Sequence, residues 1–208
     1  MVTLNNESVM KTLDAIYDYS LEGLPTSKSV YELANDYLST NVSVENAVEN
    51  LIQNQVKKCG TSGFITGLGG ILTLPITLPV NMTSVLYVQM RMVATIAHIN
   101  GFDLKSDQVK TFVYTCLTGK SMTDILKNVG IQFGRKYSTN IVKKIPGTVL
   151  IKINQKVGFR FLTKFGSTGI INLGKTIPVI GGVIGGTVDI LSTKIIAKNA
   201  VRLFVKTE

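Results

Sequence analysis

An uncharged stretch of 32 residues, CGTSGFITGLGGILTLPITLPVNMTSVLYVQM, occupies residues 59–90 of the chain. It is longer than the roughly 20 apolar residues that cross a bilayer as a helix. Pro75 and Pro79 interrupt it, and proline ends or kinks a helix because it lacks the backbone N–H and clashes with the preceding turn. The stretch therefore predicts two helices, over about residues 60–74 and 80–99, with a bend between them.

Two interpretations of these helices remain open from the sequence. The threonine, asparagine and glutamine side chains within the stretch suit a hairpin that is buried in the core of a soluble protein. The length and the absence of charge also suit a hairpin that inserts into a membrane. In that case residues 60–99 would make the chain an integral membrane protein.

The rest of the chain has apolar residues at helical spacing and no sustained strand-like alternation. We expect an all-α fold, a single helical domain with two glycine- and proline-rich apolar segments packed in its core and basic amphipathic helices toward its C-terminus. A first helix should end near Gly23. The side chains expected to cap later helices are Ser27 or Ser29, Ser43, Ser106 or Asp107, and Ser121, which with Asp124 resembles a capping box.

Charge divides the chain unevenly. Residues 1–56 hold eight acidic and two basic side chains, a net −6, whereas residues 57–208 hold twenty basic and five acidic side chains, a net +15, for a total of +9. We divide the chain into an acidic N-terminal helical region, residues 1–42, and a helical domain, residues 43–208. A basic surface of this kind suits an anionic partner.

Little in the sequence points to catalysis or to a bound metal. Cys59 and Cys116 lie far apart without a CxxC pair, and His98 is the single histidine, so we expect two reduced, buried thiols, a core histidine and no metal site. No catalytic motif is present, and we expect neither enzymatic activity nor a cofactor. The basic residues lack the aromatic partners and motifs of nucleic-acid binding, so we expect no nucleic acid.

Glycine spacing predicts close packing of helices. A glycine costs about 1 kcal/mol relative to alanine inside a helix, and several on one face let another backbone approach closely. Neither glycine segment matches a phosphate-binding loop. The glycines expected to pack together are Gly63, Gly67 and Gly70 in the first apolar segment, and Gly181, Gly182, Gly185 and Gly186 in the second, IPVIGGVIGGTVDILSTK at residues 177–194.

Two lone charges stand in these apolar helices. Arg91 follows the first uncharged stretch and Asp189 lies within the second segment. An isolated buried charge is costly, and the packing of the two segments would bring these side chains together. We predict a buried ion pair between Arg91 and Asp189, with Lys194 as an alternative partner of Asp189.

Two stripes of cations recur at every fourth residue. A basic amphipathic helix can lie on an anionic membrane, and the same spacing also suits a helix face exposed to solvent. The partner that we expect is an anionic membrane surface or an acidic protein. The stripes are Lys152, Lys156, Arg160 and Lys164, then Lys194, Lys198, Arg202 and Lys206.

Both apolar segments resemble the EcsC family of proteins. The first, GFITGLGGILTLPITLPVNMTSVLYVQMRMVATIAHINGFD, has the family's glycine-rich apolar helix, its proline-containing bend and a second helix that runs into GFD at residues 101–103. The second, within residues 145–204, has IPVIGG followed by a further Gly-Gly, an aspartate and a small-residue helix. The resemblance extends from about residue 43 to 205.

The resemblance implies a helical fold and an association with membranes or secretion, and it brings no catalytic residues. Our leading hypothesis is a non-enzymatic EcsC-like protein, cytoplasmic and peripheral to the membrane, accessory to transport or secretion. The opening MVTLNNESV lacks the features of a signal peptide, which favours the cytoplasm. The acidic N-terminal region could cover the basic or apolar surface when the protein is off the membrane. The alternatives are a soluble interaction or immunity-type factor with an acidic partner, and the integral membrane protein described above.

Overall fold

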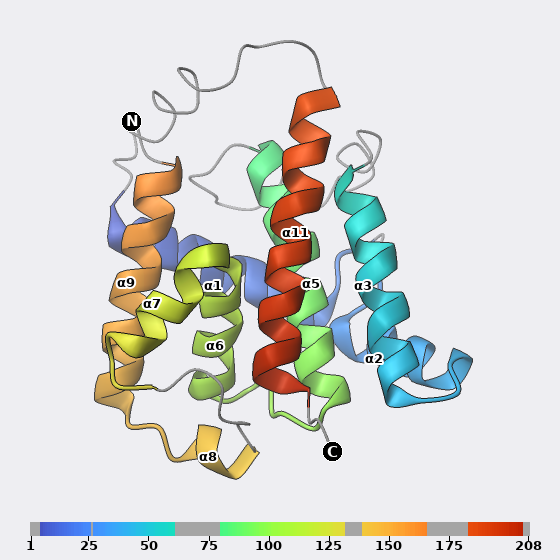
Figure 1. Ribbon diagram of the computed structural model, residues 1–208, viewed down its shortest axis with the longest axis horizontal. Helices are drawn as coiled ribbons and strands as arrows, with labels where there is room; N and C mark the ends of the chain where they lie inside the picture. Colours follow the sequence, from blue (N-terminus) through green and yellow to red (C-terminus); the bar gives the residue numbers. More distant parts are fainter. Residues whose placement is uncertain (1–4, 26, 61–79, 132–138, 166–182, 206–208) are drawn as a thin grey trace.

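The computed structural model describes residues 5–25, 27–60, 80–131, 139–165 and 183–205, and within these the regular structure is entirely helical (Figure 1). The expected all-α fold is therefore confirmed. The elements are α1 (Asn6–Glu22), α2 (Val30–Thr40), α3 (Val44–Gly60), α5 (Val80–Ile99), α6 (Asp107–Leu117), the 3-10 helix η2 (Gly119–Ser121), α7 (Met122–Lys127), α8 (Thr139–Lys143), α9 (Gly147–Phe165) and α11 (Val183–Phe204).

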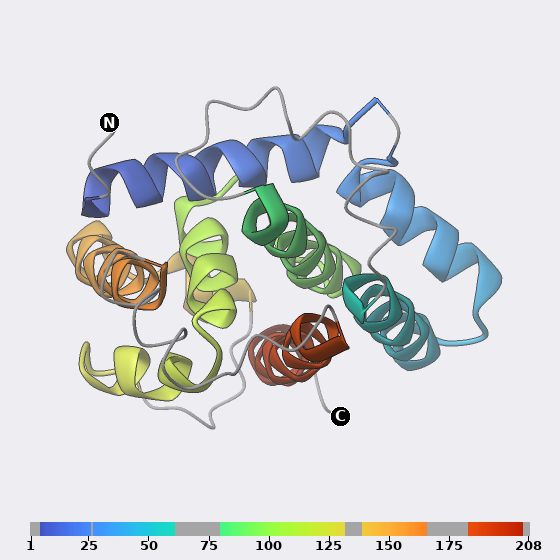
Figure 2. The ribbon, with the colours of Figure 1, turned by 90° about the horizontal axis from the view of Figure 1, so that it is seen from above.

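Helix α5 forms the centre of the bundle. It packs against α1, α2, α3, α6 and α11 (Figure 2), and every side chain from Thr83 to Ala97 is buried except that of Val85. A helix that is covered all round needs an apolar surface all round, which explains the absence of charge before Arg91. The expected helix over residues 80–99 is confirmed, and it is a core helix.

The other half of the uncharged stretch, over residues 60–74, and its bend lie outside the described residues. Across the part of the chain that the structure describes, no helix combines the length and the hydrophobicity that crossing a membrane requires.

Most helix starts lie at the side chains that the sequence indicated. At α2, Ser29 rather than Ser27 is the cap: its Oγ accepts from the Glu32 N–H at 3.1 Å, while a Glu32 carboxylate oxygen accepts from the Ser29 N–H at 2.8 Å. At α3, Ser43 Oγ accepts from the backbone N–H of Asn46. At α6, Ser106 rather than Asp107 is the cap, accepting from the Val109 N–H at 3.3 Å.

The expected capping box of Ser121 and Asp124 is wrong. The 3-10 helix η2 leads directly into α7, so the backbone of Ser121 is already helical (φ −79°, ψ −10°) and its side chain makes no capping hydrogen bond. A capping hydroxyl needs an extended backbone at its own residue. The Ser121 hydroxyl is therefore available for another partner.

The acidic N-terminal region belongs to the same core as the rest of the chain. Helix α1 ends at Gly23, which has a φ of +85°, and lies across the bundle in contact with α2, α5 and α9 (Figure 2). Val9, Leu13 and Ile16 are fully buried. The division that we placed between residues 42 and 43 falls between α2 and α3, which also pack against each other.

Two glycines permit close approach of helices, at positions that the spacing argument did not single out. A β-carbon on Gly158 of α9 would collide with the side chain of Asn6, lying 2.7 Å from its Cγ, and Asn6 Nδ2 donates to the Gln155 carbonyl at 3.0 Å. A β-carbon on Gly60 of α3 would lie 2.6 Å from Ile190 Cδ1 of α11. Glycine thus sets the spacing of α1 against α9 and of α3 against α11.

The predicted packing of the two glycine faces stays a prediction. Gly63, Gly67, Gly70, Gly181 and Gly182 lie outside the described residues, while Gly185 and Gly186 lie in the first turns of α11, at positions whose surroundings the structure does not describe.

Candidate functional site

The first basic stripe lies on the exposed face of α9. Lys152, Lys156 and Arg160 are exposed, whereas Ile153 and Val157 between them are fully buried, and α9 packs against α1, α6 and α7. The predicted amphipathic helix is thus present. The fourth member of the stripe, Lys164, lies in α9 at a position whose side chain is outside the described part.

A basic hollow lies between α9 and α7. Its volume is about 530 Å³. Arg160 and its neighbours form one wall, and α7 with the turn after it forms the other. The lining residues are Lys152, Gln155, Lys156, Phe159 and Arg160 from α9, and Asp124, Ile125, Asn128 and Val129 from α7 and the turn.

The charge of the basic hollow is positive and is not neutralised within the described residues. Three cations line it against one carboxylate, that of Asp124, which leaves a net +2. The ion pairs found in the described part of the chain join Lys11 to Glu7, Lys28 to Asp36 and Lys110 to Asp14. The cations of the hollow therefore remain open to an external anion.

Apolar side chains lie among the cations of α9. Phe159 is 59% exposed and Ile151 is 58% exposed. Each directly precedes a cation, Arg160 and Lys152, so these apolar side chains form a stripe beside the cationic one, because neighbouring residues are turned by about 100° on a helix. This exposed face of α9 combines two kinds of contact, electrostatic and hydrophobic.

The second basic stripe lies on α11. Lys194, Lys198 and Arg202 are exposed, while Ile196, Ala197, Ala200 and Leu203 are buried against the rest of the bundle. Lys206 lies outside the described residues. The exposed apolar side chains of α11, Val188 and Leu191, come before its cations and not among them.

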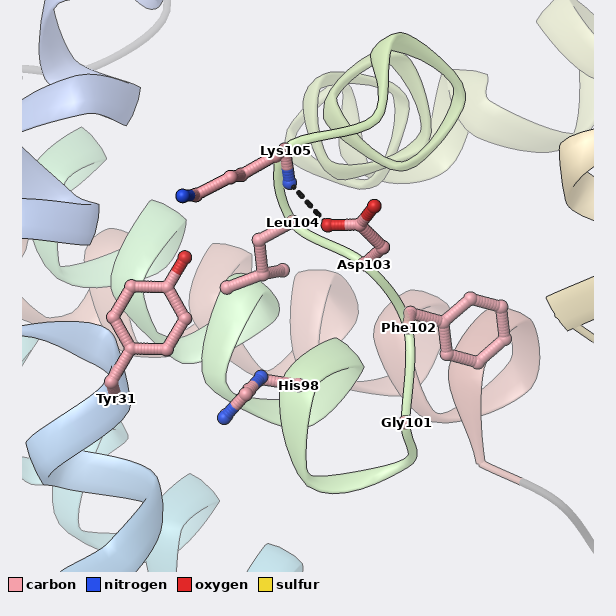
Figure 3. Close-up of a pocket in the computed structure, with 7 residues that line it drawn as sticks. All are labelled: Tyr31, His98, Gly101, Phe102, Asp103, Leu104 and Lys105. Atoms are coloured by element: carbon pink, nitrogen blue, oxygen red, sulfur yellow. Dashed lines mark hydrogen bonds between the residues drawn. The ribbon is translucent and has the colours of Figure 1, made fainter.

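A second hollow, of about 460 Å³, lies at the C-terminal end of α5 (Figure 3). Its lining includes His98, which the sequence predicted to be a core histidine and which is instead partly exposed. The ring of Tyr31 meets the imidazole edge to face, with ring centroids 4.9 Å apart. Burial, and less strongly the charge of Asp103, raises the pKa of Tyr31.

The GFD motif builds one wall of this hollow, and its contacts are those of a chain reversal. Gly101 has a φ of +81° and its N–H donates to the His98 carbonyl at 2.9 Å, which ends α5. Phe102 is buried against the ring of Phe204, at 5.0 Å between centroids. An Asp103 carboxylate oxygen accepts from the Lys105 N–H at 3.0 Å. The motif therefore ends α5 and directs the chain into α6.

Arg91 is buried, as the sequence predicted, with 4% of its surface exposed. Its Nη2 donates to the Lys28 carbonyl at 2.6 Å, and its guanidinium lies 5.5 Å from the centre of the Tyr87 ring. Burial lowers the pKa of Arg91. The pairing of Arg91 with Asp189 stays a prediction, and the contacts that the structure describes for Arg91 lead to other partners.

The contact of α5 with α11 near Asp189 is made by Gln89. Its Nε2 donates to Thr193 Oγ1 at 2.9 Å, and the Thr193 hydroxyl donates to the backbone carbonyl of Asp189 at 2.6 Å. The sequence did not predict this buried polar contact. Gln89 carries no charge and belongs to no regular spacing of polar residues.

Both cysteines are buried and free, as expected. Burial raises the pKa of the Cys59 thiol to about 11 and that of Cys116 further, so both thiols are protonated and unreactive near neutral pH. Within the described ranges, no group of three histidine, cysteine, aspartate or glutamate side chains is placed to hold a metal ion.

The described part of the chain is thus an all-helical bundle with a hollow lined by cations on one face. The EcsC protein family model matches residues 6–206, and the chain belongs to the EcsC family. The match includes α1 and α2, which lie before the residues on which the resemblance was recognised. No curated protein and no solved structure matches the chain.

Proposed function

We propose that this EcsC family protein is a non-catalytic helical module that binds the surface of an anionic membrane peripherally, through α9. The observation that carries the proposal is the exposed face of α9, where Phe159 and Ile151 lie beside three cations without described ion-pair partners. An interfacial helix needs both features, cations for lipid phosphates and apolar side chains for the acyl boundary.

The expected strength of binding is modest and sensitive to salt. Each basic residue near an anionic surface contributes about 1 kcal/mol, so the three cations of the hollow would contribute about 3 kcal/mol. Salt screens these charges within about 8 Å at physiological ionic strength. The exposed phenylalanine and isoleucine favour a lipid surface over a purely acidic protein partner, because an acidic peptide would leave them without a matching contact.

A covering role of the acidic N-terminal region is not part of the proposal. Asp14 pairs with Lys110 of α6, and Asp36 pairs with Lys28, so the described ion pairs of this region involve other cations than those of α9. An accessory role in transport or secretion is a part of the proposal that only the family resemblance motivates, and the cytoplasmic location is an expectation from the sequence.

Sedimentation with vesicles tests the proposal. The full chain should bind vesicles that contain phosphatidylglycerol, lose binding at high salt and ignore neutral phosphatidylcholine vesicles. The variant Lys152→Glu/Lys156→Glu should bind at least roughly tenfold more weakly. Lys194→Glu/Lys198→Glu on α11 makes the same charge change and should bind nearly as the unmodified chain does.

Two results would contradict the proposal. One is an absence of binding to phosphatidylglycerol vesicles, which would favour the acidic protein partner. The other is an equal loss in the α9 and α11 variants, which would show that only the total charge matters. A carbonate wash that fails to release the bound protein would favour insertion over peripheral binding.

A further inference from the structure

Arg160 lines the basic hollow and also a third, smaller hollow. This hollow has a volume of about 220 Å³, whereas a single water needs only about 10–15 Å³ by the same measure, so it has room for a polyatomic group. It lies where the ends of α6 and η2 meet α9. Its lining residues are Leu117, Thr118, Ser121, Arg160, Phe161 and Thr163.

Two of the polar side chains that line this hollow, Ser121 and Arg160, are free to donate hydrogen bonds to a ligand. Among the described residues, no carboxylate lines the hollow. The Thr118 hydroxyl donates to the Thr115 carbonyl at 2.6 Å and the Thr163 hydroxyl donates to the Arg160 carbonyl at 3.0 Å, so both protons are already used. In the part of the chain that the structure describes, the Ser121 side chain caps no helix and the Arg160 guanidinium forms no ion pair.

A free guanidinium and a free hydroxyl that line the same hollow suit a phosphate group. The planar guanidinium can donate two parallel hydrogen bonds to phosphate oxygens, and a serine hydroxyl can donate one more. Leu117 and Phe161 are each 2% exposed and form an apolar floor. Lys156, one turn before Arg160, adds positive charge on the side of the basic hollow.

We propose that Arg160 and Ser121 form a binding site for a phosphomonoester. A phosphomonoester carries about −1.5 to −2 charges at pH 7, more than the single charge of a phosphodiester, and it presents three oxygens to donors. The group could belong to a lipid or to a soluble molecule. The lipid version rests on the proposed membrane binding, whereas the soluble version does not.

Vesicles of equal total negative charge test the lipid version. Phosphatidic acid presents a phosphomonoester, and phosphatidylglycerol presents a phosphodiester. The full chain should bind phosphatidic acid vesicles roughly tenfold better, the effect of one added charge-assisted hydrogen bond. Ser121→Ala should remove most of this preference and leave binding to phosphatidylglycerol unchanged, since it changes no charge. Arg160→Lys keeps the positive charge but loses the two parallel hydrogen bonds, so it should also remove most of the preference.

A matched control is Thr123→Ala, which removes a neighbouring hydroxyl that does not line the hollow and should keep the preference. Thermal unfolding of each variant without ligand checks that the hollow is intact. Titration calorimetry with glycerol phosphate, and with glycerol as the blank, tests the soluble version on the same variants.

The outcomes separate this inference from the proposed function. A preference for phosphatidic acid that Ser121→Ala removes, or binding of glycerol phosphate that it removes, supports the site. Equal binding to both vesicle types, unaffected by either variant and without binding of glycerol phosphate, overturns the site and leaves membrane binding standing. Binding of glycerol phosphate without binding to phosphatidylglycerol vesicles supports the site and overturns the membrane proposal.

Discussion

Helices α9 and α11 both carry cations at every fourth position, but the rest of the bundle covers them differently. Helix α11 packs against α3, α5, α6 and η2, whereas α9 packs against α1, α6 and α7 at one side of the molecule (Figure 2). On α9 the exposed Phe159 lies between two cations, whereas the exposed apolar side chains of α11, Val188 and Leu191, precede the cations of that helix. Charge spacing alone therefore does not distinguish a binding face from a solvated one.

The largest expected effect is on the free energy of unfolding, and it distinguishes the buried face of α9 from its exposed face. Phe161 is 2% exposed and Phe159 is 59% exposed. Phe161→Ala should destabilise the protein by about 3–5 kcal/mol, because it leaves a cavity in the core. Phe159→Ala should change the stability by less than about 0.5 kcal/mol. Urea unfolding measures both, and equal losses would show that Phe159 belongs to the fold and not to a binding face.

The next effect compares the exposed apolar residues of the two helices. Phe159→Ala on α9 should weaken binding to phosphatidylglycerol vesicles by roughly tenfold, since partial burial of a phenylalanine contributes about 1.5 kcal/mol. Leu191→Ala on α11, a residue of 57% exposure, should leave binding unchanged. If Leu191→Ala weakened vesicle binding more than Phe159→Ala, the binding face would lie on α11.

A smaller effect concerns the approach of α1 to α9. Gly158→Ala should gain helix propensity but collide with Asn6, so its net cost should be about 1 kcal/mol or less. Asn6→Ala/Gly158→Ala should be more stable than Asn6→Ala by about 1 kcal/mol, because the collision is gone. Gly147→Ala, where a β-carbon meets no atom within 4 Å, is the control. Additive changes in urea unfolding would disprove the contact.

The stability of the protein should depend on pH through the buried thiol of Cys59, which faces α11. Burial raises the pKa of Cys59 from its ordinary value of 9.0 to about 11 in the folded protein, while a hydrogen bond with Thr193 of α11 acts in the opposite direction. The unfolded thiol ionises first as the pH rises, so stability is complete below about pH 9 and is lost between pH 9 and 11, by about 1 kcal/mol at pH 10. Cys59→Ala should flatten this part of the urea-unfolding profile, and an unchanged slope would contradict the assignment.

Much of the helical framework could be predicted from the sequence. The caps at Ser29, Ser43 and Ser106, the end of α1 at Gly23 and the extent of α5 all depend on residues within about four positions of each other. The prediction at Ser121 failed because a 3-10 turn precedes α7, and the spacing of Ser121 and Asp124 contains no sign of that turn.

The candidate sites were predicted less completely. The cations of α9 were recognised from their spacing, but Phe159 and Ile151 were not, since an apolar residue on an amphipathic helix is usually assumed to face the core. Ser121 and Arg160 are 39 positions apart in the sequence, and no local pattern relates them. The close contacts of Gly60 and Gly158 were missed because each of these contacts depends on a partner elsewhere in the chain.

The sequence by itself determined the helical class, the apolar character of α5, most helix ends and the alternation of cations on α9 and α11. Short-range hydrogen bonding and helical periodicity produce these features without reference to distant residues. Only the tertiary structure decided that α1 belongs to the core, that α9 exposes Phe159 among its cations, and that Arg160 and Ser121 line one hollow. These features depend on which helix faces the rest of the bundle covers, and that covering is set by packing between residues far apart in the chain.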